Sequence, residues 1–293
     1  MSDHQTSLLS EGCDGAGTLR NAVAYCLAEL PTAPQVATAP AVVAGIGTTA
    51  PHALHGALLL EALAQYAVPL DRTLPFTDPA ALIADGSWDL ALVLSPWKQQ
   101  VGPHLSELTA SAARTGVVDT VVRGGGALTG VNTNSWAAQA AMETLLGGQV
   151  PTSIVVLGSG GSSNSVALAA RRAWPTTRLV GSARNAAALT GWADRFAAEA
   201  VAPDELAALF AKDAPTLLVN TTTWGETDAS EDQPFAFDFA ALTAPGNSYF
   251  DLNNRVSALQ TDALRAGMNV MSGTFMQRAT NACRAALLKA RPL

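Results

Sequence analysis

Lys98 is the residue of this sequence best placed for acid–base catalysis. Lys98 follows a predicted buried strand at 89–94, and Pro96 between them breaks that strand. Open α/β sheets hold their ligand sites at the carboxyl ends of strands. A lysine whose pKa is lowered by partial burial can take or give a proton at such a site. The alternative is an ordinary surface lysine.

A glycine-rich turn at 158–161 is the second chemical feature, because it joins an apolar run to a helical pattern. Gly158 suits a tight turn, and Gly160 lacks the Cβ that would block a phosphate. Backbone N–H groups and the positive end of the helix dipole attract anions there. Ser162 and Ser163 are predicted to cap the helix and to donate hydroxyl groups to phosphate. This pattern predicts a dinucleotide site, with an ordinary strand-to-helix turn as the alternative.

A basic residue follows the next predicted strand. That strand, 177–182, lies about twenty residues after the turn, where a βαβ unit requires it. It ends without the acidic residue that binds a ribose 2′-hydroxyl, and Arg184 follows instead. A cation at this place suits a 2′-phosphate, so the sequence favours NADP over NAD, with NAD still possible. A solvated surface arginine is the alternative.

A carboxylate lies in the middle of a predicted β-hairpin. The hairpin strands are 116–123 and 127–132, separated by three glycines. Alternation puts Asp119 on the same face as Val117 and Val121. The carboxylate is therefore either on a solvated face or kept among apolar side chains for a function.

The elements that position these residues alternate between strand and helix. This alternation predicts an α/β protein, with a doubly wound parallel sheet over 151–272. The predicted strands are 41–46, 73–76, 89–94, 154–157, 177–182, 216–219, 249–252 and 268–272. The predicted helices, besides the one after the glycine turn, are 18–30, 52–66, 136–146, 186–200, 203–212, 257–266 and 274–289.

Composition narrows the classes of protein. Hydrophobic residues make up 48% of the 293 residues and charged residues only 14%, which is typical of a well-packed globular protein. The net charge of −7 argues against a nucleic-acid or anionic-membrane partner. Cys13, Cys26 and Cys283 have no metal-ligand spacing and are interpreted as free thiols in a reducing cytoplasm. No signal peptide and no metal site are expected.

The order of these motifs resembles the shikimate dehydrogenase family, from about Gly45 to the last helix. Each motif is short, and their order and spacing carry the resemblance. The matching stretches are GTTAPHALH (47–55), VLSPWK (93–98), VVDTVV (117–122), VNTN (131–134), GSGG (158–161), SARN (182–185), NTTTWG (220–225) and GTFMQRAT (273–280).

The resemblance implies two domains. It assigns 1–134, together with a returning C-terminal helix at 274–293, to a substrate-binding catalytic domain, and 135–273 to an NAD(P)-binding Rossmann domain. It also implies an NADP-dependent oxidoreductase that interconverts a hydroxyl and a ketone on a shikimate-like cyclic hydroxy acid. Such an enzyme would serve the shikimate pathway of aromatic amino acid biosynthesis in the cytoplasm, as a monomer or homodimer.

The motifs on the nucleotide side match the family well. Carried over position by position, they imply that Met276 lies against the nicotinamide. The full implied cofactor-binding set is Gly158, Ser159, Gly160, Gly161, Ser162, Ser182, Arg184, Asn220, Thr222, Gly273 and Met276.

The motifs on the substrate side depart from the family. Lys98 matches the family's catalytic lysine, but the catalytic aspartate falls on Asn134 and a substrate-binding asparagine falls on Asp119. The remaining substrate-binding positions have also changed, so the implied substrate is not simply shikimate. Those positions are Thr48 and Ala50 for a pair of serines, Thr280 for a glutamine and Asn254 for a tyrosine.

The exchange between positions 119 and 134 suggests two hypotheses. Asp119 replaces the lost catalytic carboxylate, or it pairs with an ammonium group on an amino-substituted substrate. A third interpretation is that Asp119 has only drifted and that the site is weak or inactive. The alternatives for the whole chain are thus a nucleotide-binding relative with a different small-acid substrate, or one with little catalytic activity.

Overall fold

The computed structural model describes residues 7–8, 15–31 and 39–290, which form two compact units. The 19–137 unit also contains the described residues from Arg278 onward. The 138–277 unit also contains the described residues up to Thr18. The division therefore falls inside three helices: α1 (Gly15–Ala28), α6 (Thr133–Leu146) and α12 (Gly273–Lys289). The functions predicted for the two domains remain predictions.

The 19–137 unit is built on a mixed sheet with the strand order β2-β1-β3-β5-β6-β4. β1 pairs in parallel with β2 and β3, whereas β5 runs antiparallel to both β3 and β6. The strands are β1 (Ala41–Ile46), β2 (Leu70–Phe76), β3 (Leu90–Val93), β4 (Glu107–Leu108), β5 (Thr120–Gly124) and β6 (Ala127–Val131). The predicted hairpin is confirmed by β5 and β6, but Asp119 lies one residue before β5 and not inside a strand.

The helix predicted at 52–66 is two helices. α2 (Ala50–Leu54) ends where the His55 N–H donates to the His52 carbonyl, and Gly56 is extended with ψ 135°. α3 (Ala57–Gln65) begins after that break. The other helices of this unit are α4 (Pro79–Ala84), α5 (Ala110–Thr115) and the short 3₁₀ turns η1 (Trp97–Gln99) and η2 (Gly102–His104).

The 138–277 unit has a fully parallel sheet with the order β12-β11-β10-β7-β8-β9. The chain starts in the middle, moves to one edge through β8 and β9, and then returns to the other side of β7 through β10. This is the order of a doubly wound dinucleotide fold, so the predicted fold class is confirmed. The strands are β7 (Ser153–Leu157), β8 (Arg178–Ser182), β9 (Glu199–Val201), β10 (Leu217–Asn220), β11 (Ser248–Asp251) and β12 (Asn269–Ser272).

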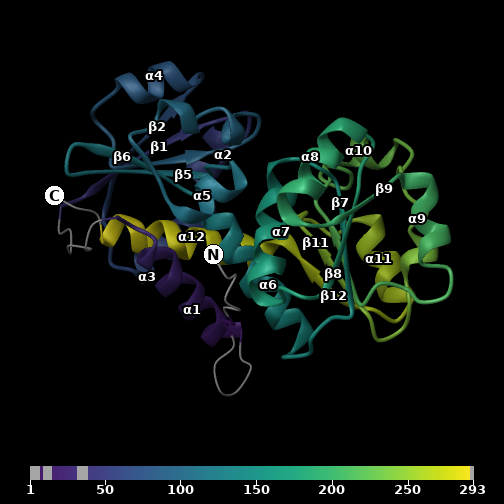
Figure 1. Cartoon of the computed structure of the whole chain (residues 1–293). Helices are drawn as coiled ribbons and strands as arrows, with labels where there is room; N and C mark the ends of the chain where they lie inside the picture. The colour runs from purple at the N-terminus through teal and green to yellow at the C-terminus, as the bar shows by residue number, and fades with distance from the viewer. Residues whose placement is uncertain (1–6, 9–14, 32–38, 291–293) are drawn as a thin grey trace. The chain divides into compact units, whose positions relative to one another are not determined.

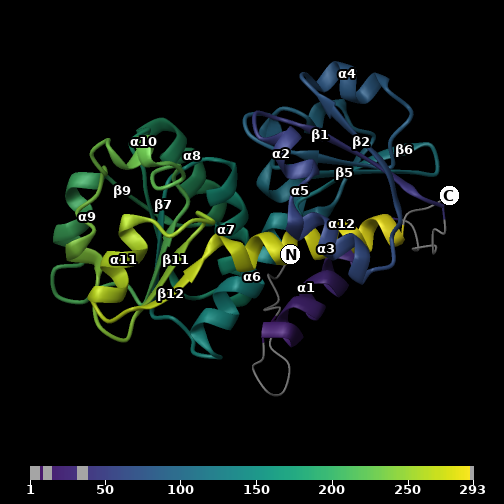
Figure 2. The same ribbon diagram turned by 180° about the vertical axis from the view of Figure 1, so that it is seen from behind.

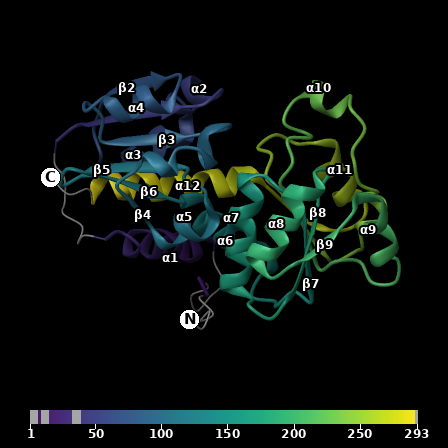
Figure 3. The same ribbon diagram turned by 45° about the horizontal axis from the view of Figure 1, so that its top comes forward.

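Helices cover both faces of this parallel sheet. Figure 1 shows α7 (Gly161–Ala173) and α8 (Ala186–Phe196) on one face, and Figure 2 shows α11 (Ala258–Arg265) on the other. Figure 3 shows α10 (Asp228–Glu231) within the long connection that follows β10. α9 (Pro203–Leu209) and η3 (Ala240–Leu242) complete the unit.

The helix predicted at 186–200 ends early. Ala197 adopts a left-handed conformation, with φ 50°, and terminates α8. The next residues form β9, in which Glu199 pairs with Val180. Pairing at the sheet edge therefore overrides the helical pattern of these alanine-rich residues.

The C-terminal helix returns to the 19–137 unit, as predicted. Residues of α12 beyond Arg278 donate hydrogen bonds to Asp119, Asn134 and Ala67 of that unit. In the described part of the chain, no helix is both long and apolar enough to cross a lipid bilayer.

Candidate functional site

Three loops of the 138–277 unit meet at one edge of its sheet. Leu157, at the end of β7, pairs with Ser182 on one side and with Asn220 on the other. The loops that follow these three strands therefore start at the same level. β7 and β10 are also the strands between which the chain changes direction, and ligands of open α/β sheets bind outside the carboxyl ends of such strands.

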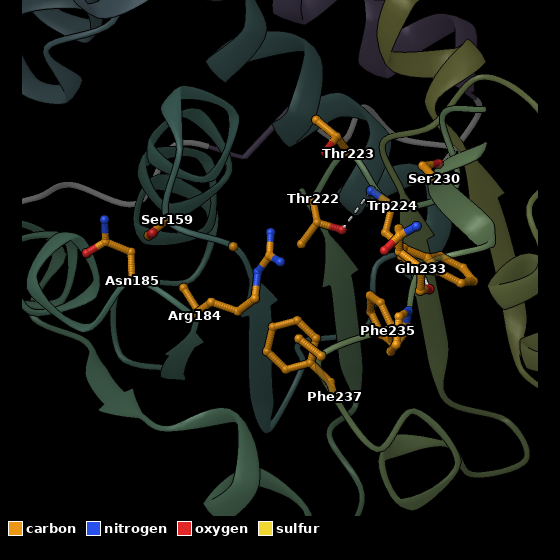
Figure 4. A pocket seen from close by; sticks show the side chains of 14 residues that line it. Ser159, Arg184, Asn185, Thr222, Thr223, Trp224, Ser230, Gln233, Phe235 and Phe237 are labelled. Carbon is orange, nitrogen blue, oxygen red and sulfur yellow. Dashed lines mark hydrogen bonds between the residues drawn. The ribbon is translucent and has the colours of Figure 1, made fainter. Parts of the chain in front are cut away.

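A pocket of about 750 Å³ opens at this edge. Its walls come from the glycine turn after β7, the segment after β8, the loop after β10 and the connection around α10 (Figure 4). A volume of this size accommodates a small-molecule ligand. Of the predicted cofactor-binding residues, Gly158, Ser159, Arg184 and Thr222 line the pocket.

The glycine turn has the backbone that a pyrophosphate requires. Gly158 has φ +111°, and a Cβ there would lie 2.6 Å from Thr221 Oγ1, so only glycine fits. Gly160 has an ordinary φ of −86°, and a Cβ there meets no protein atom within 4 Å. The open space beside Gly160 lies at the N-terminus of the 13-residue helix α7, where an anion is stabilised. These residues fit a phosphate group.

The serines after the turn do not cap α7, contrary to the prediction. The N-cap is Gly160, and no side chain bonds to it as a cap. Ser163 is buried, and its hydroxyl instead donates to the Gly160 carbonyl at 2.6 Å. A buried hydroxyl is stabilised by an acceptor within its own helical turn. The Ser163 hydroxyl therefore stabilises the glycine turn and is not directed at a ligand.

Arg184 brings a positive charge to the pocket. Its side chain is exposed and points toward the middle of the pocket, where Thr222 and Phe237 lie (Figure 4). Among the described residues, no acidic side chain forms an ion pair with it. The side-chain oxygen of the neighbouring Asn185 is used within the protein, since Oδ1 accepts from the Ala188 N–H and caps α8.

The pocket has an aromatic wall opposite the glycine turn, formed by Trp224, Phe235 and Phe237. Trp224 and Phe235 have ring centroids 5.0 Å apart, and Phe237 lies 5.1 Å from Phe235. The indole N–H of Trp224 donates to the Gln233 carbonyl at 2.8 Å, which fixes the ring. The sequence analysis missed this wall, although the alternating phenylalanines at 235, 237 and 239 were a signal for it. Flat rings stack well on such a surface.

The other predicted cofactor residues lie outside the pocket lining. Asn220 is fully buried and binds neighbouring backbone, and Ser182 is buried with no hydrogen-bond partner for its hydroxyl among the described residues. Gly273 is a close-approach glycine, because a Cβ there would collide with the Leu252 carbonyl oxygen. Met276 is buried in α12. The remaining three, Gly160, Gly161 and Ser162, lie at the start of α7.

Two predicted substrate-side residues follow neighbouring strands of the other sheet, β1 and β3. Thr48 follows β1, and its N–H donates to the Ser95 carbonyl at 3.1 Å. Lys98 is half-buried in η1, and its carbonyl accepts from the Val118 N–H at 2.8 Å. The carboxyl ends of β1 and β3 therefore hold Thr48 and Lys98. Ala50 is buried at the first position of α2.

The Asp119 carboxylate is fully buried and holds the start of α6. One oxygen accepts from the Asn134 N–H at 2.7 Å, and the other accepts from the Thr120 hydroxyl at 2.8 Å and the Thr133 N–H at 3.2 Å. The Thr133 hydroxyl donates to the same oxygen. A carboxylate at a helix N-terminus satisfies free N–H groups and complements the helix dipole. The two predicted roles of Asp119 remain predictions. Its contacts show that the carboxylate also has a structural role, because it holds the start of α6.

A buried arginine of α12 completes this cluster. Arg284 donates to the Asp119 carbonyl, the Thr120 hydroxyl and the Asn281 side chain, each at 3.1 Å. Burial lowers the pKa of Arg284, while the charge of Asp119 raises it. The sequence analysis missed Arg284, for which the signal was a single charge in the otherwise uncharged stretch 279–288.

Asn134 and Thr280 form a neutral pair. The Thr280 hydroxyl donates to Asn134 Oδ1 at 3.1 Å, and both residues are buried. Neither side chain can take up a proton from a substrate hydroxyl at neutral pH.

Asn254 and Arg255 lie in the 138–277 unit. Asn254 is exposed, and its carbonyl accepts from the Thr274 hydroxyl at 3.2 Å. Arg255 forms ion pairs with Asp228 at 2.7 Å and Glu231 at 3.8 Å, so carboxylates of its own unit hold it.

None of the described cysteines lines the pocket. Cys26 and Cys283 are buried free thiols, and Cys13 lies outside the described residues. The described residues contain no cluster of side chains able to hold a metal ion.

Sequence comparisons identify similar proteins of one kind. No protein-family model matches the chain. The chain is 31% identical over 186 residues to the shikimate dehydrogenase (NADP(+)) of Oleidesulfovibrio alaskensis, which covers 63% of this chain and 64% of that relative. The resemblance to the shikimate dehydrogenase family is confirmed. The same enzyme of Streptococcus suis is 40% identical over 72 residues, 24% of this chain and 25% of that relative. The chain thus matches less than two thirds of the length of either relative.

Solved structures share the fold. A shikimate dehydrogenase from Aquifex aeolicus has a TM-score of 0.72 at 21% identity, covering 87% of this chain and 94% of its own. A quinate dehydrogenase from Corynebacterium glutamicum in complex with NAD has a TM-score of 0.72 at 24% identity, covering 84% and 93%. A Thermus thermophilus shikimate 5-dehydrogenase, in complex with NADP(H) and shikimate, has a TM-score of 0.66 at 22% identity, covering 84% and 98%. At these identities, the likeness concerns the fold.

Proposed function

We propose that the protein is an NADP-dependent oxidoreductase that interconverts a hydroxyl and a ketone on a shikimate-like cyclic hydroxy acid. The observation that carries this proposal is the pocket at the change of strand order, where a glycine turn, the cation Arg184 and an aromatic wall face one another. A nicotinamide dinucleotide has a chemical group for each of these three features. Quinate and amino-substituted acids belong to the same substrate class.

The chain's own residues would hold the nucleotide as follows. Backbone N–H groups at the start of α7 bind the pyrophosphate, in the space left open by Gly160. Arg184 binds a 2′-phosphate, and Thr222 lines the same pocket. When bound, the nicotinamide supplies or accepts the hydride.

In this proposal, Lys98 is the general acid and base that transfers the hydroxyl proton. Oxidation of a hydroxyl to a ketone releases the hydroxyl proton, and reduction requires it back. A half-buried ammonium group beside the sheet edge can make both transfers. Thr48, on the neighbouring strand end, offers a hydroxyl to the substrate.

The cofactor preference is tested by Arg184→Met. We expect the Kd for NADPH to rise about tenfold, equivalent to about 1.4 kcal/mol, because a charge-assisted contact to the 2′-phosphate is lost. The Kd for NADH should stay within about twofold, since NADH has no such phosphate. Nucleotide fluorescence measures both constants.

Arg265→Met is the matched control for that variant, because Arg265 is exposed and pairs with Asp262 in α11. It should change neither constant. An equal loss of NADPH and NADH affinity in Arg184→Met would contradict the assignment of Arg184 to the 2′-phosphate.

The reaction is tested by turnover. Purified protein is mixed with NADP and, separately, with shikimate, quinate or aminoshikimate, and formation of the reduced nicotinamide is followed by absorbance. Turnover with one acid supports the reaction class and identifies the substrate. Turnover with none, together with NADPH binding, would contradict the proposed substrate class.

A second candidate function is a nucleotide-binding relative with another small-acid substrate or little activity. The neutral pair of Asn134 and Thr280 favours it, because the family's carboxylate is missing there. The internal hydrogen bonds of Asp119 also leave that carboxylate few free lone pairs. The free thiols Cys26 and Cys283 support a cytoplasmic location for either candidate. A monomer or homodimer remains the expected state.

A further inference from the structure

A buried carboxylate at the end of β11 has no part in the chemistry described above. Asp251 is fully buried and accepts four hydrogen bonds. One oxygen accepts from the Asn253 N–H at 3.1 Å and from Asn220 Nδ2 at 3.2 Å. The other accepts from the Ser257 hydroxyl at 2.7 Å and from Gln260 Nε2 at 3.2 Å. Burial raises the pKa of Asp251, and these donors oppose that shift.

The first Asp251 oxygen is connected to the pocket by a chain of hydrogen bonds through Asn220. With its amide nitrogen bound to Asp251, Asn220 turns Oδ1 toward the loop that follows β10. This Oδ1 accepts from the Thr222 N–H at 3.1 Å and from the Thr222 hydroxyl at 2.7 Å. The Thr222 hydroxyl oxygen then accepts from the Trp224 N–H at 3.3 Å. Thr222 and Trp224 both line the nucleotide pocket.

A second route reaches the same loop through Asn253. The Asn253 side chain donates to the Trp224 carbonyl at 2.7 Å, and its own N–H is held by Asp251. The peptide groups on both sides of Trp224 are thus fixed by residues that bind one carboxylate. The aromatic wall depends on this placement, because Trp224 packs against Phe235.

We propose that Asp251 is a positioning residue for the nucleotide, which holds the 221–225 loop in its binding shape through Asn220 and Asn253. The proposal rests on the proposed function for the identity of the ligand. A carboxylate is needed because it has two acceptor oxygens and no donor. An amide offers one acceptor and would turn its N–H₂ toward either the Asn220 or the Gln260 amide donor. A buried network of this kind is destabilised when one member is left unsatisfied, so the loop would lose its fixed shape.

The test compares Asp251→Asn with Ser257→Ala in the full chain. Both variants disturb the same carboxylate, but Ser257 binds the oxygen that makes no contact with Asn220 or Asn253. We expect Asp251→Asn to raise the Kd for NADPH about tenfold and to leave kcat at saturating NADPH within about twofold. Ser257→Ala should leave the Kd within about twofold, even though it lowers the unfolding midpoint.

Two further readouts separate positioning from general loss of stability. Amide hydrogen exchange without nucleotide should be faster over 221–225 in Asp251→Asn and unchanged there in Ser257→Ala. The double variant Asp251→Asn, Asn253→Ala should bind NADPH about as weakly as the weaker single variant, because both substitutions interrupt the same chain of contacts. If Asp251→Asn does not fold, Asn253→Ala alone is compared with Ser257→Ala in the same way.

The outcomes distinguish this proposal from the proposed function. Unchanged loop exchange, or faster exchange with unchanged NADPH affinity, would overturn the positioning role. Affinity losses that simply add in the double variant would overturn the common route through Asn253. Wild-type protein that binds neither NADPH nor NADH would overturn the proposed function, and with it the ligand named here, whatever the loop does.

Discussion

Replacing Lys98 by methionine is expected to lower kcat about a thousandfold, because a positioned general acid or base contributes on the order of 10²–10⁴ to a rate. Methionine keeps the length of the side chain and removes the ammonium group. The nucleotide pocket is built by the other compact unit, so the Kd for NADPH should stay within about twofold. Steady-state kinetics with the preferred substrate and a fluorescence titration with NADPH provide the two numbers.

Lys212→Met is the control for the loss of a lysine elsewhere, since Lys212 is exposed in the 138–277 unit. Its kcat should match that of the wild type. A Lys98→Met variant that keeps more than about a tenth of the wild-type kcat would show that another group moves the proton.

Replacing Asp119 by alanine is expected to lower the free energy of unfolding by about 3 kcal/mol. The substitution leaves the Arg284 charge buried and removes the acceptor for the N–H groups of Thr133 and Asn134. Urea denaturation of wild type and variant measures the difference. A loss below about 1 kcal/mol would mean that the hydrogen bonds of the Asp119 carboxylate contribute little to stability, and would contradict its structural role.

The double variant Asp119→Ala, Arg284→Met tests whether the two charges act together. Removing Arg284 as well should restore part of the stability, because the buried Arg284 charge is then no longer left without the opposite charge of Asp119. Asp119→Asn tests the catalytic hypotheses at the same position. Turnover should fall with every substrate if Asp119 replaces the lost carboxylate, and only with amine-bearing substrates if it pairs with an ammonium group. Unchanged turnover would contradict both.

Local patterns in the sequence predicted most of the fold. Buried parallel strands such as β7 and β10 are short apolar runs, and the glycine at 158 marks the turn that follows β7. The six-residue helices α4 and α5 and the two-residue strand β4 carry too little periodicity to be found. The errors at 55–56 and 197–200 come from backbone conformations that side-chain patterns do not encode, namely an extended Gly56 and a left-handed Ala197.

The candidate site was predicted only in part, because its supporting contacts join distant segments. Gly158, Arg184 and Thr222 could be found, since each lies within two residues of a strand end. The supporting residues Arg284 and Asp251 could not be found from the sequence. The contact of Arg284 with Asp119 spans 165 residues, and that of Asp251 with Asn220 spans 31. No local spacing in the chain indicates either pairing.

The most direct test of the account is a titration of NADPH into wild-type protein and a Gly160→Val variant. A Cβ at position 160 meets no protein atom within 4 Å and needs no unusual φ, so the variant should fold and unfold at a temperature close to that of the wild type. The same side chain occupies the space assigned to the pyrophosphate. We predict one NADPH per wild-type chain, and affinity reduced at least about a hundredfold, or about 2.7 kcal/mol, in the variant. Equal affinity in the two proteins would contradict nucleotide binding at this turn.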